Sequence, residues 1–332
     1  MTAAPDVLYN NRVHFGAADS FASIIESVQL YKMQILYNTG ERKSVERMID
    51  MLLSVDIGNS SISFGVFSAT NADSLGVEMV HSFQIATRAI TADEYAILIC
   101  DFLRIKHLVP SSSSVFYDPS YTDMGYPSID CAAVASVVPS LTETLCNAVA
   151  MITGEKPFII ASGIRTGLGI RIKNPTQLGA DIVANAVCAA AMFEAPILVL
   201  DVGTATTLTV IDEDRNILGT VIMPGLAVSL AALSGSAAQL SEIPLTAPGT
   251  LIGRDSAESV QSGVVNGHAI MIDGFIRRIR EQYPELTTNK KFSLVSTGGL
   301  SSVVLPHMRN KFTDYPTLTL SGIAHLYFRN HA

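Results

Sequence analysis

The sequence predicts an α/β protein made of two related domains, and three observations lead to this fold class. A chain of 332 residues is long enough to bury two hydrophobic cores. Its composition, 48% hydrophobic and 16% charged, is that of a globular protein. A pattern of strand, Asp-x-Gly turn and strand begins before Asp56 and occurs again at Asp201. Such an internal repeat indicates two similar domains that face each other, with the functional site between them.

We expect three segments along the chain. Residues 1–50 show no sustained periodicity and are expected to be an N-terminal extension. This extension either lies outside the fold, with Met51 as the true start, or forms a loosely attached helix. Residues 51–192 are expected to form the first domain and residues 193–332 the second.

The first domain should open with a β-hairpin. Leu52–Val55 is an apolar strand, Asp56–Ser60 is a turn, and Ile62–Phe67 has apolar residues at alternate positions. Thr91–Glu94 has the sequence of a capping box and predicts the start of a helix that runs to about Ile105.

The first domain should continue with another strand and helix. Cys131–Val138 predicts a buried strand, and Ser140–Glu143 predicts the cap of a second helix.

The plan of the first hairpin returns in the second domain. Ile197–Leu200 then predicts a buried strand that runs into the turn Asp201–Ala205, followed by the alternating strand Thr207–Val210.

The charge and the apolar pattern exclude two classes of partner. The net charge of −8 leaves no evident basic surface for nucleic acid or an anionic membrane. The longest apolar stretch, residues 184–200, is interrupted by Glu194 and Pro196 and therefore predicts a helix end, a turn and a strand instead of a membrane span. Residues 1–30 lack the apolar core of a secretory signal, so we expect a cytoplasmic protein.

The two Asp-x-Gly turns suit the binding of phosphate groups. Glycine lets the backbone approach a ligand closely, free N–H groups and hydroxyls bind oxygen atoms, and the carboxylate holds Mg²⁺ through water. One such turn is ordinary hairpin chemistry, but two can hold a polyphosphate from both sides. The sequence has neither a G-x-x-x-x-G-K-[ST] loop nor a G-x-G-x-x-G loop between strand and helix.

Three further segments carry candidate residues. Asp181, in Gly179–Asp181, opens an apolar helix and either accepts a proton from a substrate hydroxyl or stabilises the helix N-terminus. Asp255 and Glu258 predict a helix start that leaves the hydroxyl of Ser256 free for an anion, although capping explains them equally well. Thr297–Gly299 follows a strand and can bring backbone close to a nucleotide.

Together these segments resemble type III pantothenate kinase, a family of the acetate kinase, hexokinase and actin superfamily. The resemblance spans nearly all of the chain from Met51 to Asn330. Its segments are Asp56–Ser60, Thr91–Tyr95, Ser136–Pro139, Gly179–Asp181, Asp201–Thr207, Pro224–Gly225, Gln261–Gly263, Thr297–Gly299 and Leu318–Gly322.

The resemblance implies two actin-like (ribonuclease H-like) domains with a nucleotide cleft between them. It implies ATP-dependent phosphorylation of pantothenate to 4'-phosphopantothenate, the first step of coenzyme A biosynthesis. The residues that match the family's ATP site are Asp56, Ile57, Gly58, Asn59, Ser60, Ser61, Ile62, Ser63 and Thr204.

The resemblance also assigns roles to single residues. Asp56 is expected near Mg²⁺, through water, and Asp201 at a monovalent cation, K⁺ or NH₄⁺. Asp181 is expected to be the catalytic base. The expected substrate-binding residues are Ile172, Gly179, Ala180, Asp181, Ile182 and Ser256. The last of these matches a residue that reaches the pocket of a partner subunit, which implies a homodimer.

Two positions depart from the family pattern. The family's Gly-x-Asp-Arg ends here in Ile182, and a substrate-pocket Tyr falls on Ile172. Loss of an Arg contact to a buried carboxylate costs about 2–5 kcal/mol. Two alternatives therefore stand beside pantothenate kinase: a kinase of another small alcohol, and a catalytically impaired nucleotide-binding paralogue. The presence of Asp181 argues against the second.

Overall fold

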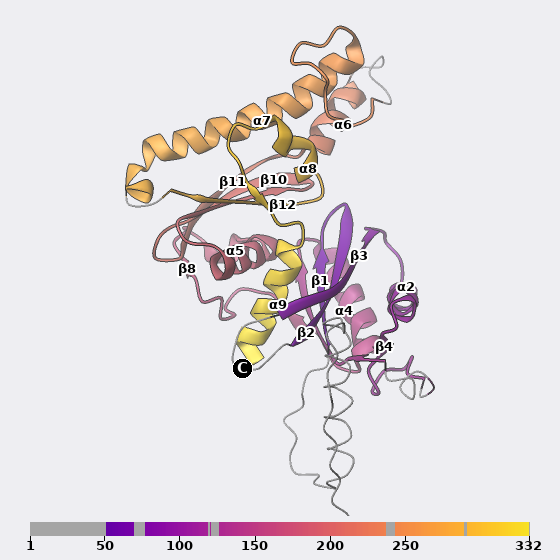
Figure 1. Ribbon diagram of the computed structural model, residues 1–332. Helices are drawn as coiled ribbons and strands as arrows, with labels where there is room; N and C mark the ends of the chain where they lie inside the picture. The colour runs from indigo at the N-terminus through magenta and orange to yellow at the C-terminus, as the bar shows by residue number, and fades with distance from the viewer. Residues whose placement is uncertain are drawn as a thin grey trace, which may run out of the picture. The chain divides into compact units, whose positions relative to one another are not determined.

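The computed structural model describes residues 51–69, 77–118, 120, 126–236, 243–288 and 291–331 (Figure 1). The predicted N-terminal extension, residues 1–50, lies outside the described residues.

The first domain is built on a five-stranded sheet in the order β3-β2-β1-β6-β7. Its strands are β1 (Leu52–Ile57), β2 (Ser61–Ala69), β3 (Val77–Ala86), β6 (Cys131–Ser136) and β7 (Phe158–Ile159). β1 is antiparallel to β2 and parallel to β6, so the hairpin lies on one side of β1 and the later strands on the other.

A second sheet repeats this plan in the order β13-β12-β9-β10-β11-β8. Its strands are β8 (Gly169–Ile170), β9 (Ile197–Val202), β10 (Ala205–Ile211), β11 (Asn216–Pro224), β12 (Ser293–Thr297) and β13 (Thr313–Asp314). β9 is antiparallel to β10 and parallel to β12, as β1 is to β2 and β6. Apart from β8, both sheets have the strand order 3-2-1-4-5 of the actin-like domain. The predicted fold class, α/β with two actin-like domains, is confirmed.

Alternation along β1 places helices on both faces of the first sheet. Leu53, Val55 and Ile57 pack with α2 (Ala92–Ile105) and α4 (Pro139–Thr153). Leu52 points the other way and packs with α5 (Ala180–Met192) and α9 (Leu318–His331).

Helix α5 contacts both sheets. Val183 and Val187 belong to the core on the first sheet, whereas Ala186 and Ala190 pack with the second. A helix surrounded by apolar neighbours must be apolar all round, which explains its long run of alanine and valine. Asp181 in its first turn is thereby held at the junction of the sheets.

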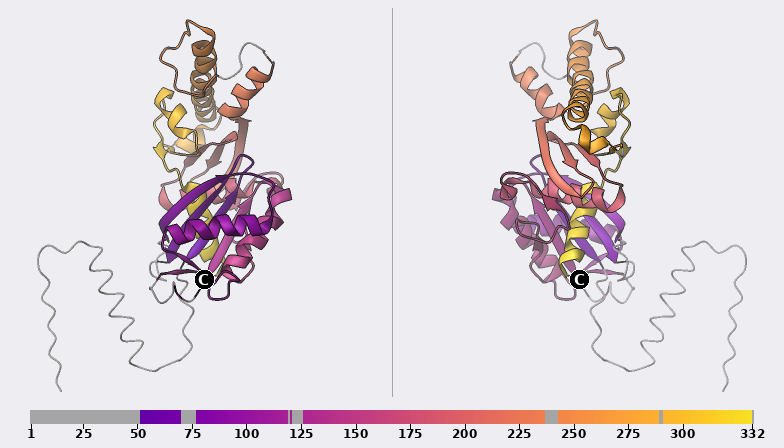
Figure 2. Two further views of the ribbon diagram at one scale, coloured as in Figure 1. Left: turned by 90° about the vertical axis from the view of Figure 1, so that its right-hand side faces the viewer. Right: turned by 90° about the vertical axis from the view of Figure 1, so that its left-hand side faces the viewer.

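The C-terminal helix α9 returns to the first sheet, as the right-hand view of Figure 2 shows in yellow. It crosses α5 closely at Gly322, where a Cβ atom would lie 1.9 Å from the carbonyl oxygen of Ala184. Glycine, which has no side chain, permits this approach. The division between domains at residue 192 stays a prediction.

Helix α7 covers the second sheet, and shorter elements complete the fold. α7 (Ser256–Gln282) packs on the face of the second sheet opposite α5. The other elements are α6 (Leu226–Ser236), α8 (Ser301–Val304), the short sheet of β4 (Val109–Pro110) and β5 (Ser128–Ile129), and the 3₁₀ turns η1 (Pro175–Gln177), η2 (Pro284–Thr287) and η3 (Leu305–His307). Within the described ranges no helix is long and apolar enough to cross a membrane.

One predicted helix cap is confirmed and another is wrong. Thr91 caps α2 with both bonds of the capping box in place. The predicted cap at Ser140–Glu143 is wrong, because α4 begins earlier, at Pro139, and has no side-chain cap. Proline suits the first position of a helix, where no N–H donor is needed. The hydroxyl of Thr142 donates back to the carbonyl of Val138 instead.

Candidate active site

In each Asp-x-Gly turn the N–H of the glycine closes the loop by a hydrogen bond, although the second loop is one residue shorter than the first. After β1, the N–H of Gly58 donates to the carbonyl of Ser61 at 3.0 Å. After β9, the N–H of Gly203 donates to the carbonyl of Ala205 at 3.1 Å. A Cβ atom on Gly58 would lie 2.9 Å from the oxygen of Ser61, so a larger residue would push the first turn open.

The two turns meet. The hydroxyl oxygens of Ser60 and Thr204 lie 2.8 Å apart, and both residues are exposed. Two residues predicted to contact ATP from different domains are thus brought together, with their hydroxyls accessible to a ligand.

The end of β3 holds the first turn in place. Thr87 donates through its hydroxyl to the carbonyl of Gly58 at 2.7 Å and through its N–H to the carbonyl of Ser60 at 3.1 Å. Thr87 is not among the residues predicted from the sequence. Its position in a polar segment just before the capping box of α2 was the available signal, but its partners depend on how β3 pairs.

Three predicted site carboxylates lie near one another. Burial raises the pKa of Asp56 to about 8, and the charges of Asp181 and Asp201 add to this increase. Burial also raises the pKa of Asp201 to about 6, with Asp181 contributing and a hydrogen bond from Asn185 opposing. The pKa of Asp181 is raised by burial, against the opposing effect of a hydrogen bond from the N–H of Ile182.

These carboxylates interact through space without forming a closed metal cage. In the part of the chain that the structure describes, no group of three or more His, Cys, Asp or Glu side chains could hold a metal ion by itself. A cation bound between Asp56 and Asp201 would have to complete its oxygen shell with ligand and water oxygens. Mg²⁺ in kinases has such a shell, so the residues present fit that group.

Asn185 orients Asp201 and is a further site residue that was not predicted from the sequence. It lies one helical turn after Asp181 on α5, with 3% of its surface exposed. Its amide donates to Oδ2 of Asp201 at 3.0 Å, and its Oδ1 accepts from the hydroxyl of Thr319 at 2.7 Å. α5, β9 and α9 are therefore joined by one chain of partly buried hydrogen bonds.

Two glycines allow backbone to approach the second turn. Gly298, in the predicted segment Thr297–Gly299, has a φ angle of +96° and would place a Cβ atom 2.6 Å from Oδ1 of Asp201. Gly225 would place a Cβ atom 2.3 Å from the carbonyl of Thr204. Both positions exclude a side chain for steric reasons.

The predicted acceptor side is apolar beside Asp181. Ile182 is only 7% exposed, and Ile172 is half-buried between β8 and η1. A side chain at Gly179 would collide with the carboxylate of Asp181, since a Cβ atom there would lie 2.3 Å from Oδ1 of Asp181. The carboxylate folds over the N-terminus of α5 and accepts the N–H of Ile182 at 2.8 Å.

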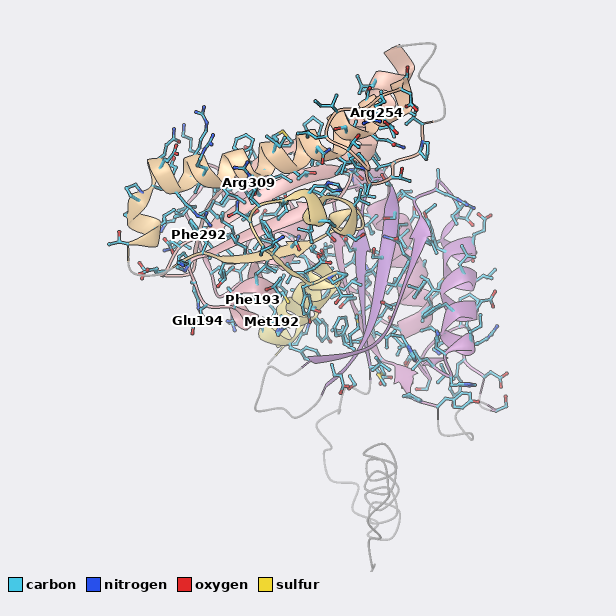
Figure 3. All side chains as sticks on the ribbon, turned by 45° about the horizontal axis from the view of Figure 1, so that its top comes forward. Met192, Phe193, Glu194, Arg254, Phe292 and Arg309 are labelled. Carbon is cyan, nitrogen blue, oxygen red and sulfur yellow. The ribbon has the colours of Figure 1, made fainter. Side chains whose placement is uncertain are left out.

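Ser256 belongs to a different element from the three carboxylates. It is the first residue of α7, and Asp255 caps the helix by accepting the N–H of Glu258 at 2.8 Å, as predicted. No hydrogen bond or ion pair among the described residues joins Ser256 to the three carboxylates. Figure 3 shows Arg254 beside this end of α7, away from Met192 at the end of α5.

Comparisons of the sequence with a family profile and with curated relatives agree on one family. The sequence profile of type III pantothenate kinase matches residues 52–278. A type III pantothenate kinase of Shouchella clausii is 36% identical over 284 residues, which are 84% of this chain and 100% of the relative. One of Moorella thermoacetica is 32% identical over 281 residues, again 84% of this chain and 100% of the relative.

Solved structures are more distant. The ethanolamine utilization protein EutJ from Carboxydothermus hydrogenoformans matches with a TM-score of 0.44 and 14% identity, covering 91% of this chain and 99% of that protein. The fold assignment rests on the strand orders of the two sheets. From the profile match and the two relatives, the chain belongs to the type III pantothenate kinase family.

Proposed function

We propose that this chain transfers the γ-phosphoryl group of ATP to the primary hydroxyl of pantothenate and gives 4'-phosphopantothenate, the first step of coenzyme A biosynthesis. The observation that carries the proposal is the meeting of two Asp-x-Gly turns, at Ser60 and Thr204, beside the first turn of α5. Membership in a kinase family supports the same reaction.

The phosphates are bound by the first turn and by Thr204. Backbone N–H groups and hydroxyls of residues 56–63 donate to phosphate oxygens, and Thr204 donates from the other domain. Because the donors are fixed before ATP arrives, little rearrangement is needed as charge moves during transfer.

Asp181 acts as the catalytic base toward the acceptor. Burial raises the pKa of its carboxyl, which makes the ionised form a better proton acceptor than an exposed aspartate. The hydrogen bond from the N–H of Ile182 fixes one carboxylate oxygen and leaves the other for the substrate hydroxyl.

Two cations belong to the proposal. Mg²⁺ is held near Asp56 through water, and a monovalent cation, K⁺ or NH₄⁺, near Asp201. When bound, they neutralise the phosphate charge. Asn185 keeps Oδ2 of Asp201 in a fixed direction for this purpose.

A second acceptor is favoured by one observation. The side chain of Ile182 is buried next to Asp181, where it offers no charged contact to the carboxylate of pantothenate. A less polar small alcohol would suit this surface better.

A homodimer and a cytoplasmic location complete the proposal. Ser256 is exposed at the first position of α7, which suits a role in a partner's acceptor pocket. Light scattering after size exclusion measures the oligomeric state. A cytoplasmic location supplies ATP and agrees with the role in coenzyme A synthesis.

The test is a steady-state assay of ADP release with ATP, Mg²⁺ and K⁺, with and without pantothenate. We expect release to depend on pantothenate and to disappear in Asp181→Asn. A panel of small alcohols serves as the second arm. Release that depends on one of these and not on pantothenate would identify a different acceptor, whereas no acceptor-dependent release would reject kinase activity.

A further inference from the structure

A row of polar residues crosses the three hairpin strands of the first sheet. Asp56 pairs with Ser63 across β1 and β2, and Ser63 pairs with Gln84 across β2 and β3. Directly paired residues project from the same face of a sheet. Their apolar neighbours on the opposite face belong to the core under α2, so this row lies on the face that carries Asp56.

Gln84 forms hydrogen bonds with the hydroxyls of two serines at the start of β2. Its Nε2 donates to the hydroxyl oxygen of Ser61 at 2.8 Å and to that of Ser63 at 3.1 Å. A carboxamide nitrogen has two hydrogens, so each hydroxyl receives one. Within the described residues neither hydroxyl donates to a protein acceptor in return.

This arrangement sets the direction of the hydroxyl protons. A hydroxyl that accepts a hydrogen bond keeps its own proton for another partner, and phosphate oxygens are acceptors only. Ser61 and Ser63 lie within the segment proposed to bind ATP, and Gln84, on β3, lies outside it. Gln84 is exposed, so the row is open to a ligand.

We infer that Gln84 is a positioning residue that orients the hydroxyl protons of Ser61 and Ser63 toward the phosphate oxygens of ATP. The inference rests on the proposed function, because it names how the nucleotide side of that site is prepared. Gln84 makes no contact with the phosphates itself and acts only through the two serines.

Two substitutions separate orientation from simple support. In Gln84→Glu the side chain keeps its size and its ability to pair with both serines, but a carboxylate only accepts hydrogen bonds. It would turn both hydroxyl protons away from the phosphates and add a negative charge. Gln84→Met keeps the length and removes the hydrogen bonds without reversing the hydroxyls.

The measurement is the Kd of Mg·ATP by isothermal titration of the full chain without acceptor. We expect Gln84→Met to raise the Kd about five- to tenfold and Gln84→Glu to raise it about 100-fold. If Gln84 only supports the two serines, Gln84→Met should raise the Kd more than Gln84→Glu does, because Glu still bridges the two serines and Met does not. The acceptor KM at saturating ATP should stay within about twofold of wild type in both variants.

Ser82→Glu is the matched control, since it adds the same charge at an exposed position of β3 that pairs with Gly65. We expect a much smaller change in Kd, and melting temperatures near wild type in all three variants. The inference is overturned if Gln84→Glu binds ATP as well as Gln84→Met, or if Ser82→Glu weakens binding equally. Wild-type chain that binds no ATP would overturn the proposed function as well, so the two failures are distinguishable.

Discussion

The hydroxyl oxygens of Ser60 and Thr204 lie 2.8 Å apart although 144 residues separate them in sequence. Each belongs to the Asp-x-Gly turn of a different domain. The contact therefore holds the two turns close enough to bind one ligand together. A phosphate oxygen placed between them would accept from both hydroxyls.

We expect Ser60→Ala and Thr204→Val each to raise the KM for ATP about three- to tenfold, because each removes one donor. In the double variant the KM for ATP should rise by less than the product of the two single effects, since the effects of residues in contact are not additive. Steady-state kinetics of the four proteins measures this, with Ser302→Ala, an exposed serine of α8, as control. Fully multiplicative losses would show that the turns act independently.

Asp181→Asn should lower kcat about 10²- to 10⁴-fold and leave the Kd for ATP nearly unchanged. Asparagine keeps an oxygen that can accept the N–H of Ile182, so the helix start is preserved while the proton acceptor is lost. Single-turnover kinetics together with ATP titration separates the two quantities. An equal loss of ATP binding would place Asp181 on the nucleotide side of the site.

The stability of the ligand-free chain should depend on pH through Asp56. Its pKa is about 8 in the folded chain and about 4 in an unfolded chain. Between these values the folded state holds a proton that the unfolded state has released. The stabilisation is thus complete at low pH and is lost as the pH rises through the folded pKa.

We therefore expect the melting temperature of wild type to fall between about pH 6 and pH 8.5, and to fall less in Asp56→Asn, which carries no titrating group there. Thermal unfolding across this range, without nucleotide or divalent cation, makes the measurement. Asp101→Asn, which alters an exposed carboxylate on α2, should follow wild type. Parallel curves for wild type and Asp56→Asn would contradict the raised pKa.

The parts of this fold that could be predicted from sequence are those decided locally. Apolar strands that run into Asp56 and Asp201, each just before a glycine turn, specify two hairpins without any knowledge of tertiary contacts. Thr91 and Glu94, three residues apart in the sequence, likewise form the capping box that starts α2. The cap predicted after Val138 failed because Pro139 had already supplied a helix start.

The residues that sequence reasoning missed depend on distant partners. Asn185 reaches Thr319 over 134 residues, which requires that α9 return to the first sheet. Gln84 and Thr87 find their partners only through the register of β2 and β3, which shifts between Val66 and Phe67. No local pattern sets a register that contains such an irregularity.

The identity of the acceptor can be tested at Ile182. In the family pattern this position carries Arg, and here an aliphatic side chain is buried one residue after Asp181. If pantothenate is the acceptor, Ile182→Arg should lower its KM about tenfold or more, because a guanidinium pairs with the substrate carboxylate. The KM for ATP should barely change. The gain is limited by the cost of a cation in the first turn of a helix.

Ile182→Met is the matched control, since it is unbranched and uncharged and should leave the pantothenate KM within about twofold of wild type. Both variants are compared by acceptor kinetics and thermal unfolding. If the pocket is shaped for a less polar alcohol, Arg is an unpaired charge among apolar neighbours and destabilises the chain. A higher pantothenate KM together with a lower melting temperature in Ile182→Arg, and neither in Ile182→Met, would therefore reject pantothenate as the natural acceptor and leave the nucleotide half of the site as proposed.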